Sequence, residues 1–402
     1  MLKTLAAQVK EFKKDSILTP VFMILEVLFE TMIPLLMASI IDKGVETGDI
    51  NHIYKVGAMM GVLALCGLWA GVMGGKYGSR ASTGFARNLR KAMYDNIQDF
   101  SFSNIDKYST AGLITRLTTD VTNLQNAYQM LLRMFTRAPA SLICAMIMAF
   151  TIHAELASIY LIAVIALGGC LILIMSRAVK YFQKVFQKYD DLNASVQENI
   201  TGIRVVKAYV REEYENQKFF KAAENVYKMF VKAENIIVAN MPLMMFTVYA
   251  CILGLSWLGA KMIVVDDLTT GELMSLLTYC MNIMMSLMML SMIFVMVTMS
   301  FASAQRVTEV LNEKSDLQNP ENPVMEVKDG SIVFNHVDFA YKKSSTEPVL
   351  KDIHVEIHSG ETIGIIGGTG SAKSSLVNLI SRLYDVTSGQ VKVGGVDVRD
   401  YD

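Results

Sequence analysis

The sequence predicts a membrane-spanning, all-α domain of six helices, followed by part of an α/β P-loop domain. Of the 402 residues, 52% are hydrophobic and only 19% are charged, which is typical of a polytopic membrane protein and excludes a disordered chain. Six long apolar stretches lie before residue 302. A glycine-rich stretch with one lysine follows them, between a strand-like and a helix-like pattern. These three observations carry the prediction.

Residues 1–15 are predicted to form an amphipathic elbow helix at the membrane surface. Leu2, Leu5 and Val9 fall on one helical face, while Lys3 and Lys10 fall on another. Separate apolar and basic faces are typical of a helix that lies in the membrane interface. The apolar stretch that follows is too long to belong to a cleavable signal peptide.

The membrane domain is predicted to cover residues 16–312. A transmembrane helix needs roughly 20 mainly apolar residues. The stretches that meet or approach this length are residues 17–41, 56–72, 138–152, 156–175, 236–260 and 273–301. Because only His153, Ala154 and Glu155 separate the third stretch from the fourth, these two are predicted to form a helical hairpin.

The positions of Lys and Arg predict the orientation. Residues 79–133 carry seven of these cations and residues 177–232 carry eleven, whereas the other three connections carry only Lys43, Lys55 and Lys261. By the positive-inside rule, the two long loops and both chain ends are cytoplasmic. The formal net charge of −1 argues against a protein built mainly to bind nucleic acid. All five cysteines lie in apolar stretches without a C-x-x-C pair, which favours packing over disulfides or metal ligands.

A polar linker is predicted at residues 313–328, and a soluble α/β unit at residues 329–402. Strand-like patterns occur at residues 331–339, 349–357 and 361–366, and helical spacing at residues 374–383. This order of strand, glycine-rich turn and helix is the context that a phosphate-binding P-loop requires.

The glycine-rich turn supplies the candidate nucleotide-binding residues: Gly367, Thr369, Gly370, Ser371, Ala372, Lys373, Ser374 and Ser375. Backbone N–H groups and the helix N-terminus attract phosphate, Lys373 reaches the β- and γ-phosphates, and the Ser374 hydroxyl is a Mg²⁺ ligand. Ala372 stands where the usual pattern has glycine, so we expect a negative φ there. Tyr341, at the end of a predicted strand, either packs locally or stacks on a purine.

Two groups of residues are candidates for substrate contact. Glu26 and Glu30 lie one turn apart near the middle of the first span, where carboxylates usually face a cavity or a partner. No Lys or Arg lies inside a predicted span to pair with them, and both hydrogen bonding to neighbouring helices and contact with a cationic substrate remain open. Met285, Met288 and Met292 belong to a methionine-rich sixth span, which forms either a polyspecific apolar wall or ordinary packing.

The whole chain resembles a subunit of the exporter-type (type I) ATP-binding cassette (ABC) transporters, in particular the multidrug-exporter group. In the membrane half, the resemblance rests on residues 26–30, 33–36, 112–118 with Asp120, and 202–209 with Arg211 and Glu212. In the soluble half, it rests on residues 337–341, the P-loop and residues 389–391.

This resemblance implies ATP and Mg²⁺ as cofactors and Tyr341 as the aromatic residue that stacks on adenine. It implies coupling helices near residues 103–107 and 209–213, and a second exporter half, identical or different, as partner in a cell membrane. ATP-driven alternating access would then export small, apolar or amphipathic molecules. The N-terminus and the nucleotide-binding domain would be cytoplasmic.

Several family motifs do not occur in these residues: the L-S-G-G-Q type signature, the strand ending in Asp-Glu, and the switch histidine. We therefore expect the sequence to belong to a longer subunit, to contain no catalytic residue of its own, and not to hydrolyse ATP alone. Two alternatives remain open. Ala372 suggests a catalytically weak partner in a heterodimer, and the same architecture would also suit a nucleotide-gated channel or sensor.

Overall fold

A computed structural model describes residues 1–341 and 347–402. The chain forms two compact units. One unit comprises Met1–Glu11, Ser82–Asn126 and Met299–Asp402, and the other comprises Phe12–Ala81 and Ala127–Thr298. Both units are therefore assembled from segments that are far apart in the sequence.

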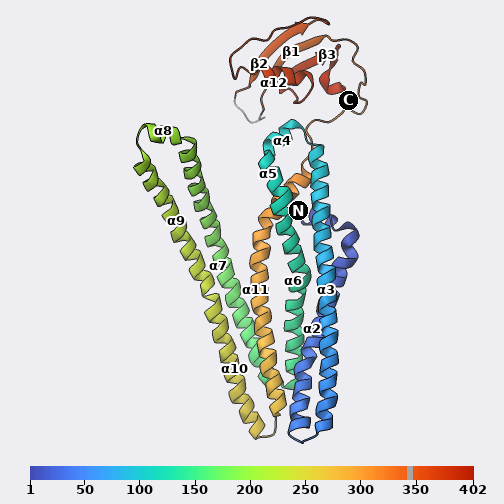
Figure 1. The fold of residues 1–402 in the computed structure, drawn as a ribbon, viewed down its shortest axis with the longest axis vertical. Helices are drawn as coiled ribbons and strands as arrows, with labels where there is room; N and C mark the ends of the chain where they lie inside the picture. The colour runs from blue at the N-terminus through green and yellow to red at the C-terminus, as the bar shows by residue number, and fades with distance from the viewer. Residues whose placement is uncertain (342–346) are drawn as a thin grey trace. The chain divides into compact units, whose positions relative to one another are not determined.

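Helices dominate the first 312 residues (Figure 1). The long ones are α2 (Lys13–Ile40), α3 (Ile50–Gln98), α6 (Val121–Ile152), α7 (Ala154–Thr201), α9 (Glu212–Val238), α10 (Asn240–Val264) and α11 (Thr270–Asn312). The short ones are α1 (Leu2–Ala7), α4 (Phe102–Tyr108), α5 (Thr110–Thr115), α8 (Ile203–Ala208) and, in the soluble part, α12 (Lys373–Ile380). Single 3₁₀ or π turns occupy Lys10–Phe12, Ile41–Val45, Arg116–Asp120 and Val398–Asp400.

Six helical segments among the described residues are long and apolar enough to cross a membrane, which confirms the predicted number of spans. Their bounds are Lys10–Val45, Ile50–Gln98, Thr110–Ile152, Ala154–Thr201, Glu212–Val264 and Thr270–Asn312. Each predicted apolar stretch lies inside one of them, because roughly 20 apolar residues in a row have few alternatives to a transmembrane helix.

The predicted hairpin of the third and fourth spans is confirmed. His153 alone separates α6 from α7, and its extended backbone (φ −151°, ψ 112°) reverses the chain. Buried tyrosines tie the spans of this unit together. The Tyr160 hydroxyl donates to the Leu276 carbonyl at 2.8 Å, and the Tyr279 hydroxyl donates to the Thr31 carbonyl at 2.7 Å. A buried hydroxyl needs such a partner, so each tyrosine fixes the register of two helices.

The helix α11 begins beside the end of the first span. The Asp42 carboxylate accepts hydrogen bonds from the Thr269 hydroxyl at 2.7 Å and from the Gly271 N–H at 2.8 Å, which caps the N-terminus of α11. A Cβ atom at Gly271 would lie only 2.5 Å from the Ala38 carbonyl oxygen, so only glycine fits at this approach.

The N-terminal residues form two short helical segments rather than one continuous helix. Lys10 has a positive φ of 42°, which interrupts the helix between α1 and the following 3₁₀ turn. Asn88 of α3 holds this corner, because its amide nitrogen donates to the Gln8 carbonyl at 3.1 Å and to the Glu11 carboxylate at 3.2 Å. Tertiary hydrogen bonds therefore override the helical pattern of residues 1–15.

The soluble part contains a four-stranded sheet with the order β2-β1-β3-β4, in which all pairs are antiparallel. The strands are β1 (Ile332–Phe339), β2 (Leu350–Ile357), β3 (Ser388–Val393) and β4 (Val396–Asp397). Phe334, Val337 and Val391 of the sheet pack with Leu379 of α12 in one buried core. The first two predicted strands and the P-loop helix are confirmed.

The third predicted strand, residues 361–366, is wrong as a description of this structure. The segment has no strand conformation, and Ile366 is 99% exposed. An apolar strand of this kind needs neighbours on both edges and cover on both faces. None of the strands in the described residues pairs with it, so its pattern predicts a strand that this structure leaves unpaired.

Candidate nucleotide site and the α4–α11 latch

The P-loop closes around its own lysine. The Lys373 ammonium donates to the Gly367 and Gly368 carbonyl oxygens, both at 2.8 Å, and lies 3.3 Å from the Ser371 hydroxyl. A Cβ atom at Gly367 would meet the Ser371 hydroxyl oxygen at 2.5 Å, and Gly370 has a φ of 87°. Glycine is thus required at both positions for a loop this tight.

These residues fit the phosphates of a nucleotide. The loop leads directly into the N-terminus of α12, where backbone N–H groups and the helix dipole favour an anion. The Lys373 ammonium lies inside the loop, where carbonyl oxygens hold it, and Ser374 is exposed next to it in the chain. Thr369, Gly370 and Ser371 lie in the same exposed turn. The donor set is that of a phosphate cradle with a hydroxyl for Mg²⁺.

Ala372 corrects one expectation. Its φ is +59° and its ψ is 21°, so the residue is left-handed, whereas we expected a negative φ. The loop imposes this conformation, because the Ala372 carbonyl must accept the Leu376 N–H at 3.0 Å to begin α12. A left-handed alanine costs about 1 kcal/mol that glycine would not. The departure from the usual glycine is therefore tolerated as local strain.

We expect Ala372→Gly to stabilise the start of α12 by about 0.5–1 kcal/mol, because glycine removes the strain at some cost in chain entropy. Hydrogen exchange of the α12 amides measures this local opening free energy. Ala340→Gly is the matched control. Ala340 is not among the residues with positive φ, so glycine there relieves no strain and only adds chain entropy, and this variant should exchange faster. Faster exchange in α12 after Ala372→Gly would contradict the strain.

Tyr341 connects the P-loop helix to a second aromatic residue. Its hydroxyl lies 2.8 Å from the Ser375 hydroxyl, and its ring packs edge-on against Tyr384 with centroids 5.1 Å apart. Tyr341 is 45% exposed, which leaves part of its ring open to a purine. Ser375 itself is buried. Packing and purine stacking, the two alternatives for Tyr341, are therefore compatible.

Tyr384 carries the contact onward to α4. Its hydroxyl donates to the Asp106 carboxylate at 2.9 Å, and its ring lies 6.1 Å from that of Phe102. Burial, reinforced by the negative charge of Asp106, raises the pKa of Tyr384 to about 12, so the hydroxyl remains a donor at neutral pH. One continuous set of contacts thus runs from Ser375 through two tyrosines to α4.

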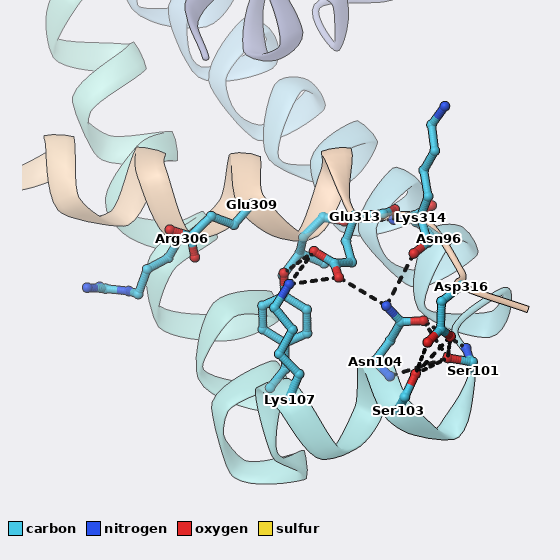
Figure 2. Close-up of polar contacts among 12 residues, drawn as sticks. Asn96, Ser101, Ser103, Asn104, Lys107, Arg306, Glu309, Glu313, Lys314 and Asp316 are labelled. Atoms are coloured by element: carbon cyan, nitrogen blue, oxygen red, sulfur yellow. Dashed lines mark hydrogen bonds and ion pairs between the residues drawn. The ribbon is translucent and has the colours of Figure 1, made fainter. Parts of the chain in front are cut away.

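The other side of α4 holds the end of α11 (Figure 2). The Glu313 carboxylate accepts hydrogen bonds from Lys107 at 2.8 and 2.9 Å, from the Tyr108 hydroxyl at 2.7 Å and from the Asn104 amide at 3.0 Å. Asp316 accepts from the Ser103 hydroxyl at 2.7 and 2.8 Å. We call this set of six residues, Ser103, Asn104, Lys107, Tyr108, Glu313 and Asp316, the α4–α11 latch.

The charged groups of the latch, Glu313 and Lys107, keep their charges at neutral pH. Burial raises the pKa of Glu313, but the hydrogen bonds from Lys107 and Tyr108 and the Lys107 charge outweigh it, and the net pKa lies below the ordinary value. The hydrogen bond to Glu313 raises the pKa of Lys107. The stability from Glu313 is therefore lost only as pH falls through its lowered pKa, and that from Lys107 only as pH rises through its raised pKa.

A buried ion pair lies beside the latch. Asp120 is fully buried and accepts from the Arg306 guanidinium at 2.7 Å and from the Ser303 hydroxyl at 2.9 Å. Arg116 pairs with Glu309 at 3.2 Å and donates to the Arg306 carbonyl at 3.0 Å. These contacts fasten the last turns of α11 to the helical segment that follows α4.

The structure corrects the interpretation of the two glutamates in the first span. Arg137 of α6, one residue before the predicted third stretch, pairs with Glu26 at 3.1 Å and with Glu30 at 2.8 Å, so a cation outside the predicted spans supplies the partner that we did not find inside them. Arg137 immediately precedes the apolar stretch that begins at Ala138, which is too short to span a membrane alone. To reach membrane-spanning length, α6 must include polar residues next to its apolar stretch, and Arg137 faces the Glu26 and Glu30 carboxylates.

Met285, Met288 and Met292 are 62%, 38% and 64% exposed, while Met284 of the same helix is 2% exposed. The methionines of α11 therefore divide between a buried side and an exposed side, and the three candidates lie on the exposed side. Their side chains are available to lipid, to another subunit or to a substrate. Among the described residues, the ion pairs of Glu26 and Glu30 are formed with Arg137, and the three methionines take no part in them.

Sequence reasoning missed Tyr384, Glu313 and Arg137. Tyr384 and Glu313 carry no local signal, since an isolated tyrosine and a glutamate in a polar linker are common on protein surfaces. For Arg137 a signal exists: a 15-residue apolar stretch must borrow neighbours to reach roughly 20 residues, which brings Arg137 into the span.

Comparison with known proteins gives two family matches. The model for the ABC transporter transmembrane region matches residues 16–288, and the model for the ABC transporter matches residues 350–402. The first match covers the helices that contain Glu26, Glu30 and Arg137. The second begins at β2 and includes the P-loop.

Curated relatives cover nearly the whole chain. An uncharacterized ABC transporter ATP-binding protein of Bacillus subtilis is 31% identical over 94% of this chain and 66% of its own length. One from Mycobacterium tuberculosis is 32% identical over 100% of this chain and 69% of its own length. A protein of Syntrophus aciditrophicus named ATP-dependent lipid A-core flippase is 29% identical over 78% of this chain and 52% of its own length. The chain spans about two thirds of the length of the first two.

Proposed function

Since the chain belongs to the ABC transporter family, with exporter-type transmembrane helices, we propose that it is one half of a dimeric transporter that exports small, apolar or amphipathic molecules by alternating access. The observation that carries the proposal is the contact path from the P-loop helix through Tyr341 and Tyr384 to α4 and, through the latch, to α11. Binding at the nucleotide site thereby has a physical route to a transmembrane helix. The partner half is a second copy or a related chain.

The proposed nucleotide contacts follow from the loop geometry. Tyr341 stacks on the base, Lys373 binds the terminal phosphates, and the N–H groups from Thr369 to Ser375 surround them. The Ser374 hydroxyl holds Mg²⁺. ATP, when bound with Mg²⁺, supplies the phosphoryl-transfer chemistry that drives the cycle. Tyr341 and Ser375 hold each other at 2.8 Å, so base and phosphate positions are linked.

Two cytoplasmic turns are proposed as coupling elements. The first is α4, which contacts both Tyr384 and Glu313. The second is α8 with the turn that follows, where Tyr209 and Val210 are 75% and 80% exposed. Exposed apolar side chains of this size on a charged helical hairpin indicate a docking surface, here for a nucleotide-binding domain. The Lys and Arg distribution supports a cytoplasmic location for the loops, the N-terminus and the nucleotide site.

We expect Glu313→Gln to uncouple transport from nucleotide binding. The substitution keeps the size of the side chain but removes the charge that Lys107 and Tyr108 bond, at a loss of about 1.5–3 kcal/mol for charged hydrogen bonds. ATP affinity should stay within about twofold, while transport should fall about tenfold. Glu321→Gln, at an exposed linker position, is the control. Parallel loss of ATP affinity and transport would contradict a coupling role.

Substrate contacts are proposed on the exposed side of α11. Met285, Met288 and Met292 offer unbranched, polarisable side chains that adapt to different apolar groups. The relative from Syntrophus aciditrophicus that is named ATP-dependent lipid A-core flippase supports an amphipathic substrate.

Transport measurements test the proposal. Sealed inside-out vesicles that contain the full chain with its partner should accumulate an amphipathic dye above its external concentration only when ATP is present outside. A nucleotide-gated channel would let the dye equilibrate and no further. Coexpression of two differently tagged copies tests the dimer, because a homodimer yields both tags in one complex.

A further inference from the structure

A pocket of about 490 Å³ opens between α2, α3 and α6. Its polar lining consists of two carboxylates and two guanidinium groups, Glu26, Glu30, Arg133 and Arg137. Its apolar lining includes Leu63, Leu68 and Val72 of α3. A cavity of this size with a few convergent polar groups and apolar walls is typical of a small-ligand site.

The two arginines of the pocket have different partners. Arg137 forms ion pairs with Glu26 at 3.1 Å and with Glu30 at 2.8 Å, so its guanidinium group already has two carboxylate partners. The Nε of Arg133 is buried, and no hydrogen-bond partner reaches it within the part of the chain that the structure describes. Arg133 forms no ion pair with those residues either. The two positions lie one helical turn apart, on the same face of α6.

Arg133 lies at the edge of the third span. Counting about 20 residues back from Ile152, where α6 ends, places Arg133 at the edge of the span. An arginine at a helix end can reach the interface, but the buried Nε of Arg133 has no described partner, which costs free energy unless a ligand compensates it. No described carboxylate lies within ion-pair distance of Arg133, although Glu26, Glu30 and Arg137 together carry a net charge of −1 in the same pocket.

The neighbouring helix is shaped around this arginine. A Cβ atom at Gly78 of α3 would lie 3.1 Å from Cδ of Arg133, and one at Gly75 would lie 4.0 Å from its terminal nitrogen. At Gly71 a Cβ atom would lie 3.2 Å from the Glu26 carboxylate. Glycines at positions 71 and 78 leave room for the Glu26 carboxylate and for the stem of Arg133 beside α3, whereas Gly75 allows an ordinary contact. The packing of these side chains against α3 therefore shapes one wall of this open pocket.

We propose that this pocket binds an acylated amphipath through a phosphate head group, with Arg133 as its anion ligand. The planar guanidinium matches phosphate oxygens with two parallel hydrogen bonds. The acyl chain lies along Leu63, Leu68 and Val72. Glu26 and Glu30 are positioning residues that orient Arg137, and they do not bind a cationic substrate. The binding site stands independently of ATP, whereas its use for cargo rests on the proposed export function.

Photolabelling of the full-length chain in detergent tests the site. The probe is a lysophosphatidic acid with a diazirine in its acyl chain, and the labelled peptide is mapped by mass spectrometry. We expect label on α3 between residues 63 and 72. Arg133→Gln should reduce labelling about tenfold at limiting probe, because it removes charged hydrogen bonds to phosphate. Arg133→Lys should retain an intermediate level, since lysine keeps the charge but not the fork.

Controls separate binding from misfolding and from the opposite charge preference. Arg177→Gln, at an exposed position of α7, should leave labelling unchanged. A quaternary ammonium probe with the same acyl chain should label α3 less than the phosphate probe. The proposal is overturned if the ammonium probe labels α3 more strongly, or if Arg133→Gln labels like the unmodified chain while eluting as the same species in gel filtration.

Nucleotide then distinguishes the two sources of such a ligand. In vesicles that contain the full chain and its partner, ATP should chase the label if the amphipath is cargo and leave it in place if the amphipath is a resident membrane lipid. Both results support the site, and only the first also supports export of this class of molecule. Failure of transport with intact labelling would count against the proposed function alone.

Discussion

Lys373→Ala is expected to weaken ATP binding by about one to two orders of magnitude and to abolish ATP-dependent transport. The ammonium lies inside the loop, 2.8 Å from two carbonyl oxygens that it would exchange for phosphate oxygens, and each charged hydrogen bond contributes about 1.5–3 kcal/mol. Alanine at this position removes these bonds and leaves the loop carbonyls facing the phosphates. Electrostatic repulsion then adds to the loss.

Equilibrium binding of a fluorescent ATP analogue to the purified protein measures the first effect, and vesicle transport measures the second. Lys351→Ala is the matched control, because Lys351 is an exposed lysine of β2 outside the P-loop. The control should bind the analogue as the unmodified protein does. Unchanged ATP affinity in Lys373→Ala would remove the P-loop from the proposed function.

Arg306→Met should destabilise the unit that contains α4, the end of α11 and the sheet by about 2 kcal/mol. Methionine keeps the apolar stem of the side chain but leaves the fully buried Asp120 carboxylate without its cationic partner. Breaking a buried pair in this way typically costs about 3–5 kcal/mol. We expect less here, because the Arg306 side chain is 45% exposed and water partly screens the pair.

A double variant isolates the stranded charge. Adding Asp120→Asn to Arg306→Met removes the buried negative charge, so part of the lost stability should return. Chemical unfolding monitored by hydrogen exchange of the β1 amides measures all three variants. If the double variant is as unstable as the sum of the two single variants, the interaction between Asp120 and Arg306 is not what stabilises this unit.

The spans and the P-loop could be predicted from the sequence because their signals are local. A run of roughly 20 apolar residues or a glycine-rich turn before a helix depends on neighbours in the chain. The predicted hairpin at His153 is of the same kind, since two apolar stretches so close together must reverse direction. The expectation of a helix near residues 103–107 came instead from the family resemblance, and α4 covers these residues.

The remainder depends on partners that local patterns do not contain. Arg137 lies outside the predicted span because the apolar stretch begins one residue after it. Two carboxylates of another helix nevertheless pair with it. Residues 361–366 have the composition of a strand, but strand formation needs neighbouring strands. Ala372 adopts a left-handed backbone because the loop dictates it, whatever its side chain prefers. In each case tertiary contacts outweigh local propensity.

The latch also changes what the linker after α11 has to do. Glu313 directly follows the last residue of α11, and it is held by α4 rather than by the linker. Asn96 of α3 donates to the Val310 and Glu313 carbonyl oxygens at 2.7 and 2.9 Å, so this end of the helix is clamped from two sides. The end of α11 is therefore held directly by α3 and α4, while linker residues Gln318 and Asn319 are bonded separately to Arg382 and Asp402.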